Sequence, residues 1–270
     1  MTIQFTKMSG SGNDFVIIDH RKPFIPDDQK RDFVKRVCAR RTSVGADGLI
    51  FIEPSSNADF RWDFYNDDGS SAEMCGNGGR CAARYAVENK IAGSQLSFET
   101  VAGVITADVD GSTVKIKLTK PVDHRPDQSV EVNGETFVID SLNTGVPHAI
   151  IYTNDIENID VAGIGRGVRF HSQFAPAGTN VDFVQVNDDG SLVVRTYERG
   201  VEGETLACGT GVVASALLAA RKHELTSPIS ARTRGGETLK VYFQPGNGSF
   251  GDVFLEGLAS KSFDGVLGEY

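Results

Sequence analysis

The sequence predicts an α+β fold built from two similar domains. Three observations lead to this prediction. The chain is long enough for two domains, its halves match each other at one fixed offset, and each half contains many short strands but few helices. With 270 residues, 40% of them hydrophobic, each half can bury an ordinary hydrophobic core.

The internal repeat becomes visible when the chain is aligned with itself at an offset of 133 residues. Four segments match: 12–18 with 145–151, 45–47 with 178–180, 75–78 with 208–211, and 100–103 with 233–236. Four matches in order and in one register are hard to attribute to the abundance of glycine. We therefore expect two pseudosymmetric domains, related by a pseudo-twofold axis, with Cys75 and Cys208 at equivalent positions.

The first half of the chain is dominated by short apolar and alternating segments, which are typical of strands. The N-terminal residues 1–8 alternate in this way. Further strands are predicted at 15–19, 49–52, 61–65, 96–98 and 114–118, and helices at 28–40 and 80–89. The pattern of this half ends near Lys120 and Pro121, where we place the linker.

The second half repeats this composition, with many strands around one long helix. Strands are predicted at 137–139, 149–152, 181–186, 192–197, 239–243 and 253–255, and a helix at 212–223. Turn sequences such as Asp188-Asp189-Gly190 separate neighbouring strands. Each half therefore resembles a sheet with one central helix.

Composition excludes several classes of protein. The net charge of −9 leaves no basic stripe for nucleic acid. No apolar segment has the length of a membrane span, and the N-terminus lacks the layout of a signal peptide. Four scattered cysteines without Cys-x-x-Cys spacing predict neither a disulfide framework nor a zinc site. We expect a cytoplasmic protein without a metal ion.

Two of the cysteines stand in the same local sequence. Cys75 and Cys208 each begin a Cys-Gly-x-Gly turn that leads into an Ala-rich helix. A helix N-terminus presents unpaired N–H groups and a partial positive charge. A thiol there is expected to have its pKa lowered from roughly 8.5 towards neutrality, and a carboxylate can bind the same N–H groups.

These features together indicate proton transfer at an amino-acid α-carbon. One thiolate would remove the α-proton from one face, and the other thiol would return a proton to the opposite face. The N–H groups would stabilise the developing enolate-like charge. Free cysteines are often only small buried hydrophobic residues, and this is our interpretation of Cys38 and Cys81. The repeated motif argues for catalysis at Cys75 and Cys208.

Over nearly its whole length the sequence resembles the diaminopimelate epimerase family. The resemblance is carried by residues 5–8, 12–15, 44–48, 64–70, 74–81, 145–148 and 197–211, which include Met-Cys-Gly-Asn-Gly-Gly-Arg-Cys and Glu-Arg-Gly-Val-Glu-Gly-Glu-Thr. It implies interconversion of LL- and meso-diaminopimelate for lysine and peptidoglycan synthesis, without pyridoxal phosphate or any other cofactor. It also implies curved, mostly antiparallel sheets, each wrapped around a central helix, and a homodimer.

The resemblance also assigns roles to individual residues. It makes Cys75 and Cys208 the acid–base pair, and residues 261–270 a strand returning to the first domain. The domains are then 1–120 with 261–270, carrying Cys75, and 121–260, carrying Cys208. Gly76, Asn77, Gly209 and Thr210 match the N–H groups that hold the reacting carboxylate. Asn13, Asn66, Asn180, Glu198 and Arg199 match substrate-binding positions, notably for the distal centre, and His148 and Glu198 match residues that assist near the thiols.

Two departures from the family pattern concern substrate recognition. Val146 stands where many members have Asn, and Gly48 where some have Gln. Three other functions compete with epimerisation of diaminopimelate. Proline or hydroxyproline racemases share the two cysteines but typically have His in place of Asn77. Phenazine-type isomerases lack the cysteine pair. A non-catalytic amino-acid-binding protein would need neither cysteine.

Overall fold

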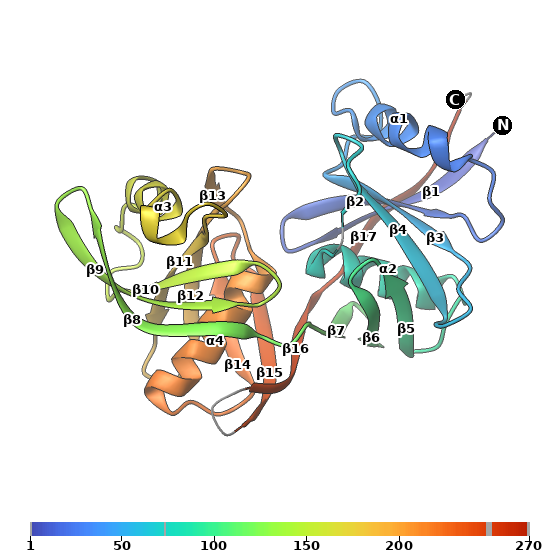
Figure 1. Cartoon of the computed structure of the whole chain (residues 1–270). Helices are drawn as coiled ribbons and strands as arrows, with labels where there is room; N and C mark the ends of the chain where they lie inside the picture. The colour runs from blue at the N-terminus through green and yellow to red at the C-terminus, as the bar shows by residue number, and fades with distance from the viewer. Residues whose placement is uncertain (1, 73, 247–249, 269–270) are drawn as a thin grey trace. The chain divides into compact units, whose positions relative to one another are not determined.

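The computed structural model describes residues 2–72, 74–246 and 250–268. The chain divides into two compact units (Figure 1). The N-terminal unit comprises Met1–Lys117 together with Gly257–Tyr270, and the C-terminal unit comprises Leu118–Glu256. Each unit contains one sheet and two principal helices, so the predicted α+β class is confirmed.

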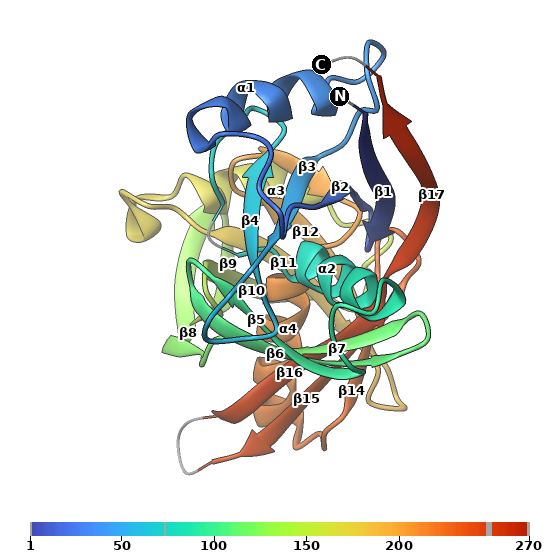
Figure 2. The same ribbon diagram turned by 90° about the vertical axis from the view of Figure 1, so that its right-hand side faces the viewer.

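In the described residues, the sheet of the N-terminal unit contains eight strands. Their spatial order is β17 (Ser260–Leu267), β1 (Ile3–Gly10), β2 (Asn13–Asp19), β3 (Gly48–Glu53), β4 (Phe60–Asn66), β5 (Gln95–Thr100), β6 (Gly103–Asp110) and β7 (Thr113–Lys117). The pairs β2–β3 and β4–β5 are parallel, and the other pairs are antiparallel. The C-terminal strand β17 lies beside β1 (Figure 2). Glu269 and Tyr270, the end of the predicted returning strand, lie outside the described residues.

The C-terminal unit repeats this topology. Its strands follow the order β8 (Val122–Val132), β9 (Glu135–Asn143), β10 (Pro147–Tyr152), β11 (Asn180–Val186), β12 (Leu192–Glu198), β14 (Ile229–Thr233), β15 (Thr238–Pro245) and β16 (Phe250–Leu258). Here too the third and fifth pairings are parallel. A short strand, β13 (Gly203–Thr205), also pairs with β12. The sequence repeat therefore corresponds to a duplicated fold.

One helix in each unit occupies the concave side of the sheet (Figure 1). The helix α2 (Gly76–Glu88) contacts strands from both ends of its sheet, β1 and β7 among them, and α4 (Gly209–His223) contacts strands from β9 to β15. The helices α1 (Asp27–Cys38) and α3 (Val161–Arg169) pack on the other face of the two sheets. The curved sheet around a central helix is confirmed in both units.

Coverage on both faces explains why the central strands are apolar without alternation. In β3 every residue is buried. Leu49 and Phe51 pack with α1, whereas Ile50 points to α2, where it would contact a side chain at Gly78. In a strand covered on both sides, every polar residue is therefore buried, and such residues need specific partners.

The helix α3 was not predicted, because its sequence contains Gly163, Gly165 and Gly167, which disfavour helices. Its glycines allow close packing. A Cβ on Gly165 would lie 2.5 Å from Tyr197 of β12, and one on Gly167 would lie 2.2 Å from Val132 of β8. The N-cap of the helix is Asp160, whose side chain accepts a hydrogen bond from the Gly163 N–H. Packing against the sheet outweighs the poor helix propensity here.

The boundaries of the other helices differ from prediction by a few residues. Both α2 and α4 begin at the glycine after the cysteine, earlier than the predicted starts at Arg80 and Val212, so the Gly-rich turn belongs to the helix. The strands β6, β8, β13 and β14 were not predicted, although turn sequences mark some of their ends. In β8 most side chains are exposed, so its hydrophobic pattern is weak.

Candidate active site

The two repeated cysteines cap the two central helices. Cys75 is the N-cap of α2 and Cys208 is the N-cap of α4, and both have extended backbone conformations. The Cys75 sulfur accepts a hydrogen bond from the Gly78 N–H at 3.4 Å. The next residues, Gly76 with Asn77 and Gly209 with Thr210, form the first turns, where backbone N–H groups lack intrahelical partners. Each first turn can therefore bind an anion.

The last glycine of the Cys-Gly-x-Gly motif is required by packing at Gly211, whereas Gly78 has room for a Cβ in close contact. A Cβ on Gly211 would lie 2.2 Å from Oδ1 of Asp182. At Gly78 a Cβ would lie 3.4 Å from Phe15, Ile50 and Trp62. The start of α4 thus rests on a carboxylate, and the start of α2 rests on an apolar surface.

The expected lowering of the thiol pKa is wrong for Cys208. Only 8% of this residue is exposed, and burial raises the pKa of its thiol. The nearby carboxylates Glu198 and Asp182 raise it further. Together these effects outweigh the lowering by the Gly211 N–H and the lowering that Thr210 gives if it donates to the sulfur. Desolvation penalises the thiolate more than the helix N-terminus stabilises it. The surroundings of Cys208 therefore favour its protonated thiol form.

In the N-terminal unit, hydrogen bonds join two of the predicted substrate-binding residues. Asn77 donates to the side-chain oxygen of Asn13 at 2.8 Å, and Asn13 donates to Asp47 at 3.0 Å. The buried Arg80 donates to Asn77 at 3.0 Å and so fixes the orientation of its amide. Asn66 is placed differently, because its amide donates to Ser70 in the turn after β4.

In the C-terminal unit, the predicted residues surround Cys208 more closely. The hydroxyl of Thr210 lies 3.4 Å from the Cys208 sulfur and 3.0 Å from Nε2 of His148. The amide nitrogen of Asn180 lies 3.5 Å from the same Nε2 atom. His148 is fully buried, and its Nδ1 atom lies 2.7 Å from Asp182. These residues form one connected polar group beneath the start of α4.

Glu198 and Arg199 have different surroundings. Burial raises the pKa of the Glu198 carboxyl, and the carboxyl in turn raises the pKa of Cys208. The guanidinium of Arg199 donates to the Ala177 carbonyl at 3.1 Å, and its backbone N–H donates to Asn180 at 2.8 Å. Glu198 thus belongs to the surroundings of Cys208, which is one of the two places that the family resemblance predicts for it.

The two departures from the family pattern occupy different environments. Gly48 lies at the start of β3, where a Cβ would be 2.6 Å from the Phe64 ring and 2.7 Å from the Tyr65 carbonyl. No larger side chain fits there without movement of the backbone, so a Gln at this position is incompatible with the packing. Val146 is half-buried in the turn before β10.

Sequence reasoning missed Asp182, Thr196 and Arg80, which hold the site residues in place. Asp182 is fully buried in β11 and accepts a hydrogen bond from Thr196 at 2.7 Å. A signal existed in the sequence, since Asp182 interrupts the apolar run 181–186 of a predicted strand. A buried charge in such a strand requires a partner, and His148 is that partner.

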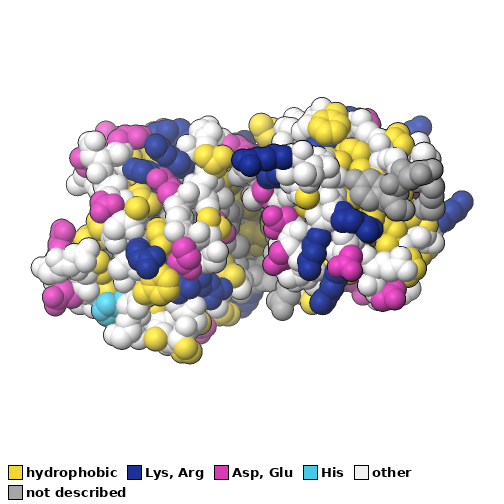
Figure 3. Space-filling model, turned by 90° about the horizontal axis from the view of Figure 1, so that it is seen from above, with side chains coloured by type: hydrophobic (Ala, Val, Ile, Leu, Met, Phe, Trp, Pro, Cys, Tyr) yellow, Lys and Arg dark blue, Asp and Glu magenta, His cyan; other side chains and the backbone are white. Residues whose placement is uncertain are grey.

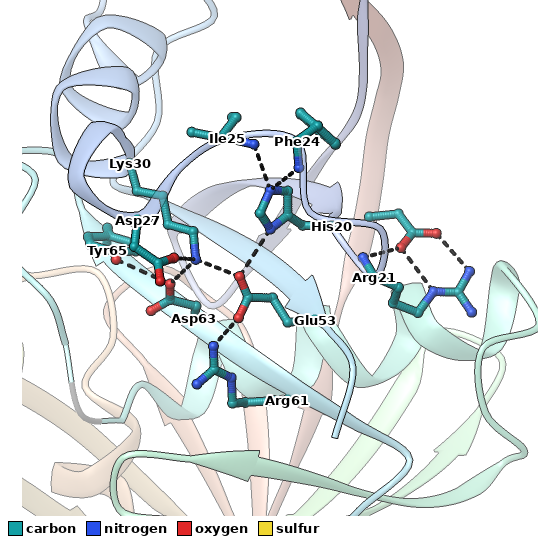
Figure 4. Close-up of polar contacts among 11 residues, drawn as sticks. His20, Arg21, Phe24, Ile25, Asp27, Lys30, Glu53, Arg61, Asp63 and Tyr65 are labelled. Carbon is teal, nitrogen blue, oxygen red and sulfur yellow. Dashed lines mark hydrogen bonds and ion pairs between the residues drawn. The ribbon is translucent and has the colours of Figure 1, made fainter. Parts of the chain in front are cut away.

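One cluster in the described part of the chain has the composition of a metal site. Oxygen atoms of Asp27, Glu53 and Asp63 lie within 4.8 Å of one another. The ammonium group of Lys30 lies among them, at 2.8, 2.5 and 2.8 Å respectively (Figure 4). A cation of the chain itself therefore fills the position that a metal ion would take.

On the face in Figure 3, positive and negative side chains are interspersed and no stripe of one sign is visible. Within the described residues, no helix has both the length and the apolar character needed to cross a lipid bilayer.

Comparisons with known proteins agree with the geometry. A family model described as diaminopimelate epimerase matches residues 5–122 and 141–250. The diaminopimelate epimerase of Aquifex aeolicus is 47% identical, over 99% of this chain and 98% of that protein. A PhzF-family phenazine biosynthesis protein of Bacillus anthracis has a TM-score of 0.78 at 15% identity, covering 99% of both chains. A hydroxyproline epimerase of Agrobacterium vitis has a TM-score of 0.73 at 16% identity, covering 98% of this chain and 92% of that one. At such low identities the two solved structures share only the fold.

Proposed function

Because this chain belongs to the diaminopimelate epimerase family, we propose that Cys75 and Cys208 interconvert LL- and meso-diaminopimelate by two-base proton transfer. The observation that carries this proposal is the duplication of one arrangement, a cysteine at the N-cap of the central helix in each unit. Two thiols are needed because inversion removes a proton from one face of the α-carbon and adds one to the other.

The reaction balances without a cofactor. In one direction the Cys75 thiolate takes the α-proton, so that an S–H bond forms as the C–H bond breaks. The electron pair of that bond delocalises into the α-carboxylate. The Cys208 thiol then gives its proton to the opposite face, and a C–H bond forms as its S–H bond breaks. The reverse direction exchanges the two roles.

The α-carboxylate is held by the first turns of the two central helices. Backbone N–H groups of Gly76 and Asn77 bind one part of it, and those of Gly209 and Thr210 bind the other. Their lack of intrahelical partners supports this role. As negative charge grows on the carboxylate in the transition state, these preorganised donors gain strength without having to reorient.

The remaining residues recognise the two ends of the substrate. Arg199 pairs with the distal carboxylate through its forked guanidinium. Asn13, Asn66 and Asn180 supply amide contacts, and Val146 removes one polar contact that many family members make. Glu198 binds the ammonium group at the reacting centre, a role supported by its electrostatic effect on Cys208. His148 assists from below Thr210.

The experiment that tests this function compares substrates. Purified protein is incubated with LL-diaminopimelate, meso-diaminopimelate, L-proline and trans-4-hydroxy-L-proline, and the stereoisomers are separated by chiral chromatography. We expect turnover of the diaminopimelates alone. Racemisation of proline or epimerisation of hydroxyproline at a comparable rate would favour the proline racemase class, and binding without turnover of any compound would favour an amino-acid-binding protein.

The assembly and location of the protein also follow from this proposal. Residues 1–120 with 261–270 and residues 121–260 act as two domains that close on substrate, and the division into two compact units supports this. Two copies form a homodimer, in line with the exposed Phe263 and Val266 of β17, and sedimentation velocity would detect a monomer instead. Thiol chemistry requires a reducing compartment, which supports a cytoplasmic location that cell fractionation can check.

A further inference from the structure

A chain of hydrogen bonds runs from Cys208 to a buried carboxylate. It passes from the Cys208 sulfur to the Thr210 hydroxyl (3.4 Å), from there to Nε2 of His148 (3.0 Å), and from Nδ1 of His148 to Asp182 (2.7 Å). At its far end, Asp182 accepts a hydrogen bond from Thr196 (2.7 Å). His148 and Asp182 are both fully buried, so the geometry of the chain is shielded from water.

The surroundings of His148 fix the direction of each hydrogen bond. The Asn180 side-chain oxygen accepts from the Arg199 backbone N–H, so the Asn180 amide must turn its nitrogen towards Nε2. Nε2 therefore faces a donor and must itself be an acceptor. The imidazole proton then lies on Nδ1, where it is donated to the Asp182 carboxylate.

The same logic sets the orientation of the Thr210 hydroxyl. Its proton points to Nε2 of His148, because that atom offers a lone pair at 3.0 Å. Only the oxygen lone pairs of Thr210 then remain for the Cys208 sulfur. The sulfur can complete this hydrogen bond by donating its own proton, so the chain favours the S–H form of Cys208. Burial of Cys208 beside Glu198 acts in the same direction.

Among the described residues of the N-terminal unit, apolar side chains lie against the start of α2. The strand register makes Ile50 of β3 the structural counterpart of Asp182 of β11. Ile50 lies opposite Phe64 of β4, and Asp182 lies opposite Thr196 of β12. Phe15, which matches His148 in the repeat, and Ile50 both lie against Gly78, whereas His148 and Asp182 lie against Gly211. The two cysteines are thus equivalent in position but differ in what lies beneath them.

We propose that Asp182 is a positioning residue that acts through His148 and Thr210 to hold Cys208 as the proton-bearing thiol of the substrate-free enzyme. This inference rests on the proposed role of Cys208 as one of the two acid–base groups. It makes the duplicated site asymmetric: Cys208 begins as the acid, and Cys75 is left to begin as the base.

The substitution Asp182→Asn tests the chain of hydrogen bonds, because the asparagine side chain has nearly the same shape as the aspartate side chain. The asparagine oxygen still accepts from Thr196, but its amide donates to Nδ1 and moves the imidazole proton to Nε2. The Thr210 hydroxyl then turns its proton to the sulfur, and a negative charge near Cys208 is lost. Both changes favour the thiolate. The groups facing Cys208 that titrate or carry charge are Glu198 of β12, Asp182 of β11 and His148 of β10.

The first readout is the reaction of Cys208 with methyl methanethiosulfonate, followed from pH 5 to 10 by mass spectrometry of the Cys208 peptide. We expect Asp182→Asn to raise the rate at pH 7 about tenfold or more, which corresponds to a midpoint about one pH unit lower. Cys75 in the same sample serves as an internal reference. Asp140→Asn is the matched control, because Asp140 is another buried aspartate of this unit and bonds to Asp127 and Lys222 instead.

The second readout is the imidazole tautomer of His148, measured by ¹⁵N NMR in the unsubstituted protein and needing no variant. We expect a proton on Nδ1. A proton on Nε2 would overturn the proposal. The proposal would also be overturned if Cys208 reacted at the same rate in Asp182→Asn as in Asp140→Asn.

The third readout is epimerisation of LL-diaminopimelate as a function of pH. The alkaline limb of kcat/KM reports loss of the proton from the acid, so it should move to lower pH in Asp182→Asn but not in Asp140→Asn. If the alkaline limb stays in place although the reactivity of Cys208 has changed, Asp182 has no part in the reaction. If the unsubstituted protein has no epimerase activity, the proposed function fails, whereas the tautomer and the reactivity of Cys208 still report on the chain itself.

Discussion

Replacing either Cys75 or Cys208 by alanine is expected to lower kcat for epimerisation by about 10³-fold or more. General acid–base groups contribute about 10² to 10⁴ in rate, and inversion needs both groups in every turnover. Cys75 is half-exposed at the N-cap of α2 and Cys208 is small and buried at that of α4, so alanine should preserve the fold at both positions. Activity is measured by chiral chromatography and folding by circular dichroism.

The other two cysteines provide matched controls. Cys38 is 2% exposed in α1, where burial raises the pKa of its thiol to about 12, and Cys81 is fully buried in α2. Cys38→Ala and Cys81→Ala should cost about 1 kcal/mol of stability, because each removes one buried sulfur, and should keep kcat within about twofold. Near-normal turnover in Cys75→Ala or Cys208→Ala would remove that cysteine from the mechanism.

The substitution Lys30→Met is expected to lower the free energy of unfolding by about 3–5 kcal/mol, the usual cost of leaving buried charges without their partner. Only 1% of the Lys30 side chain and 5% of the Glu53 side chain are exposed. Lys30 bridges Glu53 and Asp63 from α1 to the sheet (Figure 4). Glu53 would keep hydrogen bonds from His20 and Arg61, but Asp63 would lose its ammonium partner.

Urea denaturation measures this loss, with Lys35→Met as the control, because Lys35 is an exposed lysine of the same helix. The control should stay within about 0.5 kcal/mol. Burial tends to raise the pKa of Glu53, but hydrogen bonds from Lys30, Arg61 and His20 outweigh it and lower the pKa to about 2. The contribution of the ionised Glu53 to the free energy of unfolding is therefore complete above about pH 5 and is lost as the pH falls towards 2. A Lys30→Met protein as stable as the control at pH 7 would contradict this account.

Much of the site was predictable because the duplication is visible in the sequence. Cys-Gly-x-Gly occurs twice at one offset, and the structure places both cysteines at helix N-caps. The apolar runs also predicted the central strands, since strands covered by helices on both faces bury nearly every residue. These features depend on local sequence and periodicity alone.

The rest depends on contacts between residues far apart in the chain. The raised pKa of the Cys208 thiol could not be predicted from the sequence. It arises because Glu198 and Asp182 lie near the sulfur and because the sulfur is buried away from water. Asp182 and His148 are 34 residues apart and meet only because β10 and β11 are parallel neighbours. Likewise α3 forms despite three glycines, because its partners are side chains of β8 and β12.

The central claim is that two thiols act on opposite faces of one α-carbon, and isotope incorporation tests it most directly. The protein is incubated with LL-diaminopimelate in D₂O, and the reaction is stopped within the first few per cent of conversion. Substrate and product are then separated, and the deuterium content of each is measured by mass spectrometry. Each thiol carries a single proton, so the abstracted proton stays on one sulfur while the other sulfur delivers deuterium taken from solvent. We predict one deuterium at the inverted α-carbon of meso-diaminopimelate and none in the remaining LL substrate. Product that retains the original α-hydrogen, or substrate that exchanges as fast as product forms, would contradict a two-base mechanism.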